Sequence, residues 1–158
     1  MNDWLWTTIL TLLPIAELRG GLPYALLEGG IPWIMAYPYC VLVNALVAPL
    51  AYLFLDTAHK ILYKWGFYAR IFDRVVERAR LKVMAKVERF GFWGVAVFVG
   101  IPLPITGAWT GTLGAWILGL SRRKTMIAVL AGVTISGLIV SGIVLAGIEA
   151  LDLFIKHV

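Results

Sequence analysis

The chain has 158 residues, of which 61% are hydrophobic and 15% charged, and a formal net charge of +5. Its mean hydropathy of +0.87 excludes an ordinary soluble domain, which would expose far more charge. The length leaves room for one membrane domain, and the single cysteine, Cys40, excludes an intramolecular disulfide and a cysteine metal site. The sequence lacks a G-x-x-x-x-G-K-[ST] loop, which argues against ATP-driven transport, and we expect no cofactor and no metal.

The first apolar stretch, residues 4–16, is too short to cross a hydrocarbon core of about 30 Å, which takes about 20 apolar residues. A polar patch broken by glycine and proline follows at residues 14–23. The economical arrangement is a re-entrant helical hairpin, which enters the membrane, turns at depth and leaves on the same side. We assign the backbone of its tip to Gly20, Gly21 and Pro23.

Two uncharged runs, residues 33–55 and 126–148, have the length of complete membrane spans. In the first run Asn44 and Pro49 mark a kink, because proline removes a backbone donor and clashes with the preceding turn. The backbone groups that a kink frees need a partner. Asn44 is therefore a candidate contact between this span and a second hairpin farther along the chain.

The linker at residues 59–89 carries most of the basic residues. Its apolar residues recur every three or four positions, the period of an amphipathic helix. The basic face consists of Arg70, Arg74, Arg78, Lys82 and Lys86. Such a helix can lie on an anionic membrane surface, or it can pack on the transmembrane core while its arginines only fix the topology. Nucleic-acid binding is disfavoured, because membrane segments flank the basic residues.

Residues 90–121 contain no charge, but two prolines divide them into arms of about half a membrane each. We therefore expect a second re-entrant hairpin. Glycine in its tip permits close backbone approach, and threonine offers hydroxyl groups. The tip comprises the backbone at Pro102, Pro104, Gly107 and Gly111 and the hydroxyls of Thr106 and Thr110.

Basic residues in short loops mark the cytoplasmic side, which places the linker and residues 122–124 in the cytoplasm. The second hairpin then opens to the cytoplasm, the first opens outward, and both termini lie outside. The expected fold is an all-α integral membrane protein, an inverted repeat of two units, each a re-entrant hairpin followed by a transmembrane helix. The units are residues 1–58 and 90–158, joined by the amphipathic helix at 59–89 in a single membrane domain, 1–158.

Glu17 and Arg19 are the strongest candidates for chemistry, because ionisable groups at membrane depth are costly and usually functional. Glu17 is suited to carrying a proton. The planar guanidinium of Arg19 is suited to binding a phosphate or carboxylate group. The alternative is a structural pair that only locks the hairpin. Glu28 is a second candidate titrating group, although solvation at the outer rim explains it equally well. A helix that begins at a hairpin tip would present free N–H groups to an anion.

Two motifs are similar to those of a known family: E-L-R-G-G-L-P at residues 17–23 and I-P-L-P-I-T-G-A-W-T-G at 101–111. On these motifs the chain resembles the putative small multidrug export protein family over nearly its whole length. That family is distantly similar to the DedA/VTT superfamily, whose fold contains two oppositely facing re-entrant hairpins, each followed by a transmembrane helix. The resemblance implies a prokaryotic plasma membrane and, from the wider group, proton-dependent flipping of polyprenyl-phosphate or phospholipid.

The resemblance to DedA proteins carries over in part, residue by residue. Glu17 and Glu28 are similar to the two acidic residues associated with their first hairpin. Their second hairpin carries arginines beside its proline, where this chain has Ile101, Thr106 and Gly107. Arg19 would then supply the cation from the opposite hairpin.

The leading hypothesis is a small, proton-coupled secondary transporter or exporter with a midplane site between the two hairpin tips. An alternative is a DedA-like flippase or scramblase of polyprenyl-phosphate or another anionic lipid. A hypothesis of another class is a non-transporting membrane scaffold that acts through its basic helix. We expect no enzyme, since neither tip holds a serine or histidine for a catalytic dyad. The expected partners are the bilayer, a small-molecule or lipid-phosphate substrate and a second copy in a homodimer.

Overall fold

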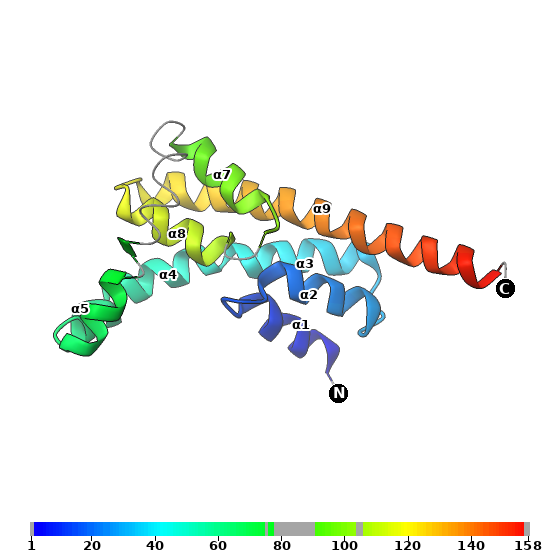
Figure 1. Ribbon diagram of the computed structural model, residues 1–158, viewed down its shortest axis with the longest axis horizontal. Helices are drawn as coiled ribbons and strands as arrows, with labels where there is room; N and C mark the ends of the chain where they lie inside the picture. Colours follow the sequence, from blue (N-terminus) through cyan, green and yellow to red (C-terminus); the bar gives the residue numbers. More distant parts are fainter. Residues whose placement is uncertain (1, 75, 78–90, 104–105, 157–158) are drawn as a thin grey trace.

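Figure 1 shows the computed structural model, which describes residues 2–74, 76–77, 91–103 and 106–156. All regular secondary structure in this part of the chain is helical, as expected. The helices are α1 (Asp3–Leu12), α2 (Glu17–Leu27), α3 (Trp33–Ala45), α4 (Val47–Asp56), α5 (Ala58–Leu62), α7 (Phe92–Gly100), α8 (Ala108–Ile117) and α9 (Arg122–Lys156). Two stretches, Trp33–Leu62 and Arg122–Gly147, are long and apolar enough to cross a membrane.

The helices α1 and α2 form a first hairpin with a tip shorter than the sequence predicts. Because α2 begins at Glu17, irregular backbone is confined to residues 13–16, and Gly20, Gly21 and Pro23 lie inside α2. A Cβ at Gly21 would overlap the hydroxyl of Thr11, so glycine allows α1 and α2 to pack closely. The fixed φ of Pro23 suits a helix, and its ring removes one hydrogen-bond donor without ending α2.

The first candidate span is one helical stretch with local breaks that divide it into α3, α4 and α5. The break at Leu46 agrees with the predicted kink, because Pro49 has no N–H for the carbonyl of Ala45, where α3 ends. The stretch extends beyond the predicted residues 33–55 to Leu62. At the end of α4, Asp56 forms an ion pair of 2.8 Å with Arg122 at the start of α9.

The second hairpin consists of α7 and α8, which pack against α9. Gly111 of α8 and Gly132 of α9 both face Val99 of α7, and a Cβ at either glycine would overlap that valine. Close packing of helices therefore explains Gly111 without a role in the tip. The helix α9 has 35 residues and begins at Arg122, earlier than the predicted span at 126–148, so that the basic residues 122–124 form its first turn.

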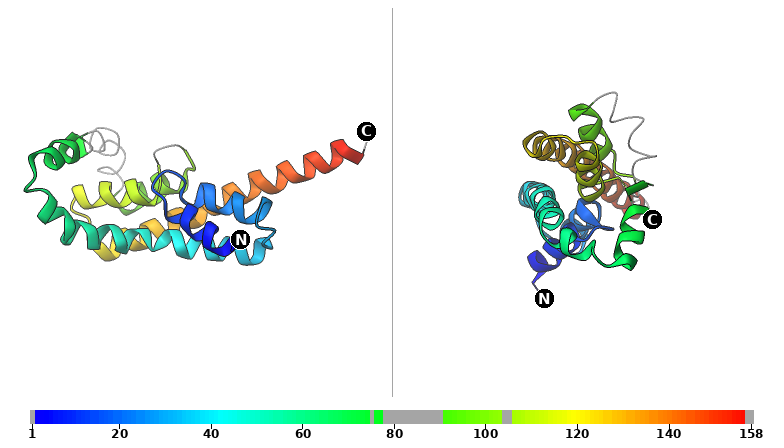
Figure 2. Two further views of the ribbon diagram at one scale, coloured as in Figure 1. Left: turned by 90° about the horizontal axis from the view of Figure 1, so that it is seen from below. Right: turned by 90° about the vertical axis from the view of Figure 1, so that its left-hand side faces the viewer.

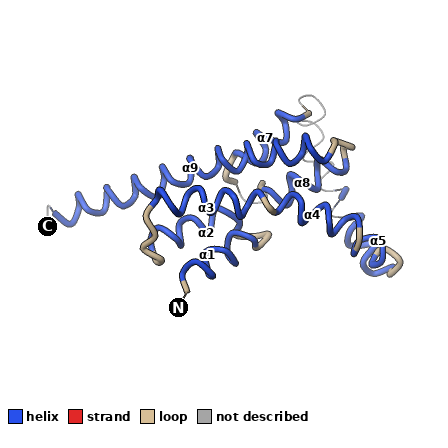
Figure 3. Tube along the Cα trace, turned by 180° about the vertical axis from the view of Figure 1, so that it is seen from behind, coloured by secondary structure: helices blue, strands red, loops and turns tan. Residues whose placement is uncertain are grey.

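The two hairpin tips lie beside each other near the middle of the long axis, and their arms run toward opposite ends of the molecule (Figure 1; Figure 2). The helix α9 runs along both hairpins, whereas α3 lies beside the first hairpin and α4 beside the second (Figure 3). Buried apolar side chains of α2, α3, α7 and α9 form the core between them, including Leu18, Leu22, Cys40, Val99 and Val129. Glu17 beside the first tip and Gly107 and Ala108 beside the second are buried, whereas Ile15 and Leu103 within the tips are exposed.

The described part of the linker packs on the helical body. Helical backbone begins at Gly66, and the ring of Phe72 lies 4.1 Å from that of His59 and 6.4 Å from that of Trp116. Arg70 and Arg74 are exposed. The other members of the predicted basic face, Arg78, Lys82 and Lys86, lie outside the described residues.

Candidate functional site

The side chain of Glu17 crosses from the first hairpin to the second. Its carboxylate is buried, with the residue 3% exposed. Oε2 accepts a hydrogen bond of 3.0 Å from the backbone N–H of Ala108, and Oε1 accepts one of 3.3 Å from that of Trp109. Ala108 and Trp109 are the first two residues of α8. Glu17 therefore occupies the N-terminus of a helix in the opposite hairpin.

Local backbone geometry makes this contact feasible. The first N–H groups of a helix have no intrahelical acceptor, and the helix dipole favours a negative charge there. Gly107 precedes these groups, and a Cβ at this position would overlap the Glu17 carboxylate. Glu17 itself has a φ of +51°, a left-handed conformation that costs an L-residue about 1–2 kcal/mol. The fold therefore holds Glu17 in an unfavourable conformation that aims its side chain at α8.

Arg19 makes the second contact between the tips. Its guanidinium donates to the carbonyl oxygen of Leu103, and Nη2 lies 3.9 Å from Oε2 of Glu17. The Arg19 side chain is 19% exposed, because it lines an open cavity of about 330 Å³. Residues of both tips form the cavity wall: Ile15, Ala16, Arg19, Gly20 and Pro102. A positive charge therefore faces a hollow between the hairpins.

Asn44 and Trp109 surround the Glu17 carboxylate with further polar groups. The side chain of Asn44 on α3 lies near that carboxylate. Asn44 is 2% exposed, and its Oδ1 has no partner among the described residues. The indole Nε1 of Trp109 donates to the carbonyl of Leu12 at 3.0 Å, which ties α8 to the end of α1. Asn44 thus reaches the first hairpin, whereas the sequence predicted a contact with the second.

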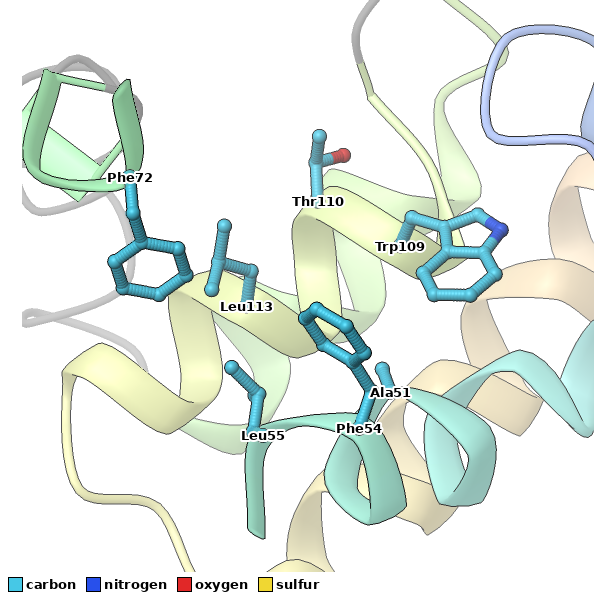
Figure 4. Close-up of a pocket in the computed structure, with 7 residues that line it drawn as sticks. All are labelled: Ala51, Phe54, Leu55, Phe72, Trp109, Thr110 and Leu113. Carbon is cyan, nitrogen blue, oxygen red and sulfur yellow. The ribbon is translucent and has the colours of Figure 1, made fainter. Parts of the chain in front are cut away.

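An apolar pocket of about 190 Å³ adjoins this site (Figure 4). Side chains of α4, α8 and the linker line it: Ala51, Phe54, Leu55, Phe72, Trp109, Thr110 and Leu113. Trp109 belongs to both places, since its backbone N–H binds Glu17 while its ring forms a wall of the pocket. A molecule with an apolar body and a polar end could therefore approach the Glu17 site along α8.

The remaining candidates from the sequence have local roles or lie elsewhere. The hydroxyl of Thr106 lies 2.6 and 2.8 Å from the carbonyl oxygens of Ile101 and Leu103 and closes the second tip. The Thr110 hydroxyl donates to the carbonyl of Gly107 at 3.3 Å. Glu28 is exposed at the far end of α2, away from Glu17. Pro104 lies outside the described residues.

Several polar side chains of the interior are threonines, and no sequence pattern singles out those of α1. Thr7, Thr11 and Thr112 are 0% exposed, and the hydroxyl oxygens of Thr7 and Thr112 have no partner in the described part of the chain. A threonine on an apolar helix usually bonds its own backbone, so its type alone does not mark a site. Within the described residues, no group of three or more His, Cys, Asp or Glu could hold a metal ion.

Comparison with known proteins identifies the family. The chain belongs to the family described as putative small multi-drug export protein, whose model matches residues 17–139. The matched segment begins at Glu17, directly after the first tip, and contains the second tip, both sides of the Glu17 contact and most of each candidate span. Searches of curated proteins and of solved structures returned no match. Together with the two long apolar helices, the family identifies the chain as a membrane protein of an export family.

Proposed function

We propose that this protein is a small, proton-coupled secondary transporter that exports organic molecules through a site between its two hairpin tips. The observation that carries the proposal is the buried contact of Glu17 with the N-terminus of α8. A carboxylate inside a membrane protein is a natural proton carrier. Broken helices whose N-terminal ends point at a midplane site are typical of transporters.

We further propose that both hairpins are re-entrant and that the halves form an inverted repeat. The four arms α1, α2, α7 and α8 have 9 to 11 residues each, or about 15 Å, half of a hydrocarbon core of about 30 Å. The meeting of the tips in the middle of the molecule supports this arrangement. The helix α5 and the start of α9, which carry basic residues, lie at the same end, which we assign to the cytoplasm.

In the proposed mechanism, proton binding at Glu17 controls access to α8. The ionised carboxylate fills the N-terminus of α8 and lies beside Arg19. Protonation removes its negative charge, so the N–H groups of Ala108 and Trp109 and the guanidinium of Arg19 become available to a polar group of the substrate. The apolar pocket beside Trp109 would accept the body of that substrate. Release of the proton restores the Glu17 contact and expels the polar group.

Transport by purified protein in liposomes tests the proposal. The liposomes would contain a pH-sensitive dye under an imposed pH gradient, with ethidium as the first probe and organic anions next. We expect a transported probe to move with a change of internal pH, and Glu17→Gln to reduce both signals to those of empty liposomes. Glu28→Gln is the matched control, because Glu28 is exposed and distant from the site, and it should transport like the wild type. Unchanged, pH-dependent transport by Glu17→Gln would refute the proposal.

A flippase or scramblase of polyprenyl-phosphate or another anionic lipid is the second candidate. Arg19 favours it, because the guanidinium lines an open cavity between the tips and suits a phosphate group. Native mass spectrometry of gently purified protein distinguishes the candidates. A lipid-phosphate adduct retained by the wild type and by the control Arg70→Ala, but lost from Arg19→Ala, would favour the flippase. The same spectra report the assembly, for which we propose a homodimer; a monomer would contradict that assignment.

A further inference from the structure

A row of polar groups lies between the first hairpin and α3 and leads to Glu17. On α1, Asp3, Thr7 and Thr11 follow one another at intervals of four residues, so they share one face of the helix. On α3, Cys40 and Asn44 share a face in the same way. The hydroxyl oxygen of Thr11 lies 3.8 Å from Sγ of Cys40, within hydrogen-bond range for sulfur, which joins the two faces. We call Asp3, Thr7, Thr11, Cys40, Asn44 and Glu17 the polar row.

The inner members of the polar row are buried, and its first member is not. Thr7, Thr11 and Cys40 are 0% exposed, and Asn44 and Glu17 are 2% and 3% exposed. Asp3 lies at the outer end of α1, is partly exposed, and accepts a hydrogen bond of 3.5 Å from the hydroxyl of Tyr24. The row therefore begins at the partly exposed Asp3 and follows α1 for about 12 Å to Thr11. It ends at the buried carboxylate of Glu17.

Two oxygens of the polar row have no protein partner in the described part of the chain: Oγ1 of Thr7 and Oδ1 of Asn44. Threonines in helices commonly donate to the carbonyl four residues earlier, as Thr8 and Thr11 do here. Thr7 does not. Buried polar atoms are almost always hydrogen-bonded, and ordered water is the usual partner when the protein supplies none.

We propose that the polar row is a hydrated proton path from the outer end of α1 to Glu17. Water beside Thr7 and beside Asn44 would complete a chain of hydroxyl, thiol and amide groups between bulk solvent and the carboxylate. A proton entering at Asp3 ends on Glu17, and no other group is chemically changed. This inference rests on the proposed function, because it supplies the proton that Glu17 is assigned to carry.

Cys40 allows a direct test, because it is the only cysteine in the chain and lies in the middle of the row. The exchange of its S–H proton for deuterium after transfer to D₂O can be followed by infrared spectroscopy of the intact protein. The reference thiol is Val129→Cys in a Cys40→Ala background, since Val129 is 0% exposed in the apolar core. We expect Cys40 to exchange at least about tenfold faster than the reference, a factor that corresponds to about 1.4 kcal/mol. Exchange at the reference rate would overturn the proposal.

A matched pair of threonine variants tests the route. Thr7 and Thr112 are equally buried and neither hydroxyl has a partner among the described residues, but Thr112 lies on α8, outside the polar row. Thr7→Val should slow Cys40 exchange toward the reference rate, and Thr112→Val should leave it unchanged. Equal effects of the two variants would contradict the route. If Thr7→Val does not fold, the comparison of wild-type Cys40 with the reference thiol still decides.

Failure of this inference is distinguishable from failure of the proposed function. Glu17→Gln should abolish transport while Cys40 still exchanges at the wild-type rate, because the substitution leaves the groups between Asp3 and Asn44 in place. If Cys40 exchanges at the reference rate while transport depends on Glu17, the proton path alone is refuted. If Cys40 exchanges faster than the reference thiol while Glu17→Gln leaves transport unchanged, the proposed function is refuted instead.

Discussion

At the scale of single residues, Glu17 is held by backbone groups that the sequence could not identify. Its importance, and that of Arg19, can be predicted, because charges inside an apolar stretch are costly. Its partners are the N–H groups of Ala108 and Trp109. Every residue other than proline carries such a group, and only the fold determines which of them lack an acceptor and lie beside a carboxylate. The sequence predicts that a hairpin helix offers free N–H groups to an anion. In the structure the carboxylate of Glu17 is the anion that accepts from them.

Gly107→Ala tests the closeness of this contact. The added Cβ would overlap the Glu17 carboxylate, so we expect a loss of about 1–3 kcal/mol in stability, as for other overpacked sites. Thermal unfolding in detergent micelles measures it as a lower Tm. Gly142→Ala is the control, because a Cβ there meets nothing within 4 Å, and it should leave Tm unchanged or raise it.

A double variant shows whether the effect of Gly107→Ala comes from Glu17. Combined with Glu17→Ala, which removes the carboxylate, Gly107→Ala should cost less than it does alone. The two changes should then be coupled by about 0.5–3 kcal/mol, as expected for residues in contact. Additive effects would show that the clash at Gly107 involves another group.

At the scale of helices, apolar lengths and proline positions predicted the all-helical fold and the two candidate spans. The two long apolar stretches are present, and Pro49 explains the break at Leu46. The start of α2 does not follow from the residue types, because Gly20, Gly21 and Pro23 are poor helix formers. Their environment overrides that preference: Gly21 accommodates Thr11, and Leu22 is fully buried in the core. Asn44 was predicted near a hairpin, but the choice of hairpin depends on how α3 is rotated, which no local pattern specifies.

The contact between α4 and the start of α9 yields a second prediction. The hydroxyl of Tyr52 is buried and donates to Oγ1 of Thr125 at 3.0 Å, whereas the nearby ion pair joins the exposed Arg122 to the partly exposed Asp56. Tyr52→Phe should cost about 1 kcal/mol in the free energy of unfolding, and Asp56→Asn less, because exposed ion pairs contribute little. A larger drop in Tm for Asp56→Asn than for Tyr52→Phe would show that the ion pair dominates this contact.

At the scale of the whole molecule, hairpin tips from opposite halves of the chain lie side by side (Figure 1). Apolar lengths and charge placement predict two short hairpins, but they do not specify that the tips touch. That follows from the packing of α2, α3 and α7 along α9, in which buried residues far apart in sequence form one core. The proposed membrane topology follows from this arrangement and from the basic end of the molecule.

Cysteine labelling in cells checks that topology. In a Cys40→Ala background, a cysteine replacing the exposed Asn2 should react with a membrane-impermeant maleimide added to intact cells. A cysteine replacing the exposed Lys64 should react only after the cells are permeabilised, because basic residues mark the cytoplasmic side. Labelling of both positions from the same side would contradict the proposed inverted repeat.

Proton-coupled transport requires that Glu17 bind and release a proton in the folded protein. Infrared difference spectra of the wild type, recorded as the pH is changed, should contain a carboxylic-acid band that persists in Glu28→Gln and is missing in Glu17→Gln. Such a band would establish that the carboxylate at the N-terminus of α8 exchanges protons, as proton-coupled transport requires. The opposite result is that the wild type and Glu17→Gln give identical spectra at every pH at which the protein stays folded. That result would contradict proton coupling through Glu17 and leave Glu17 a structural link between the hairpins.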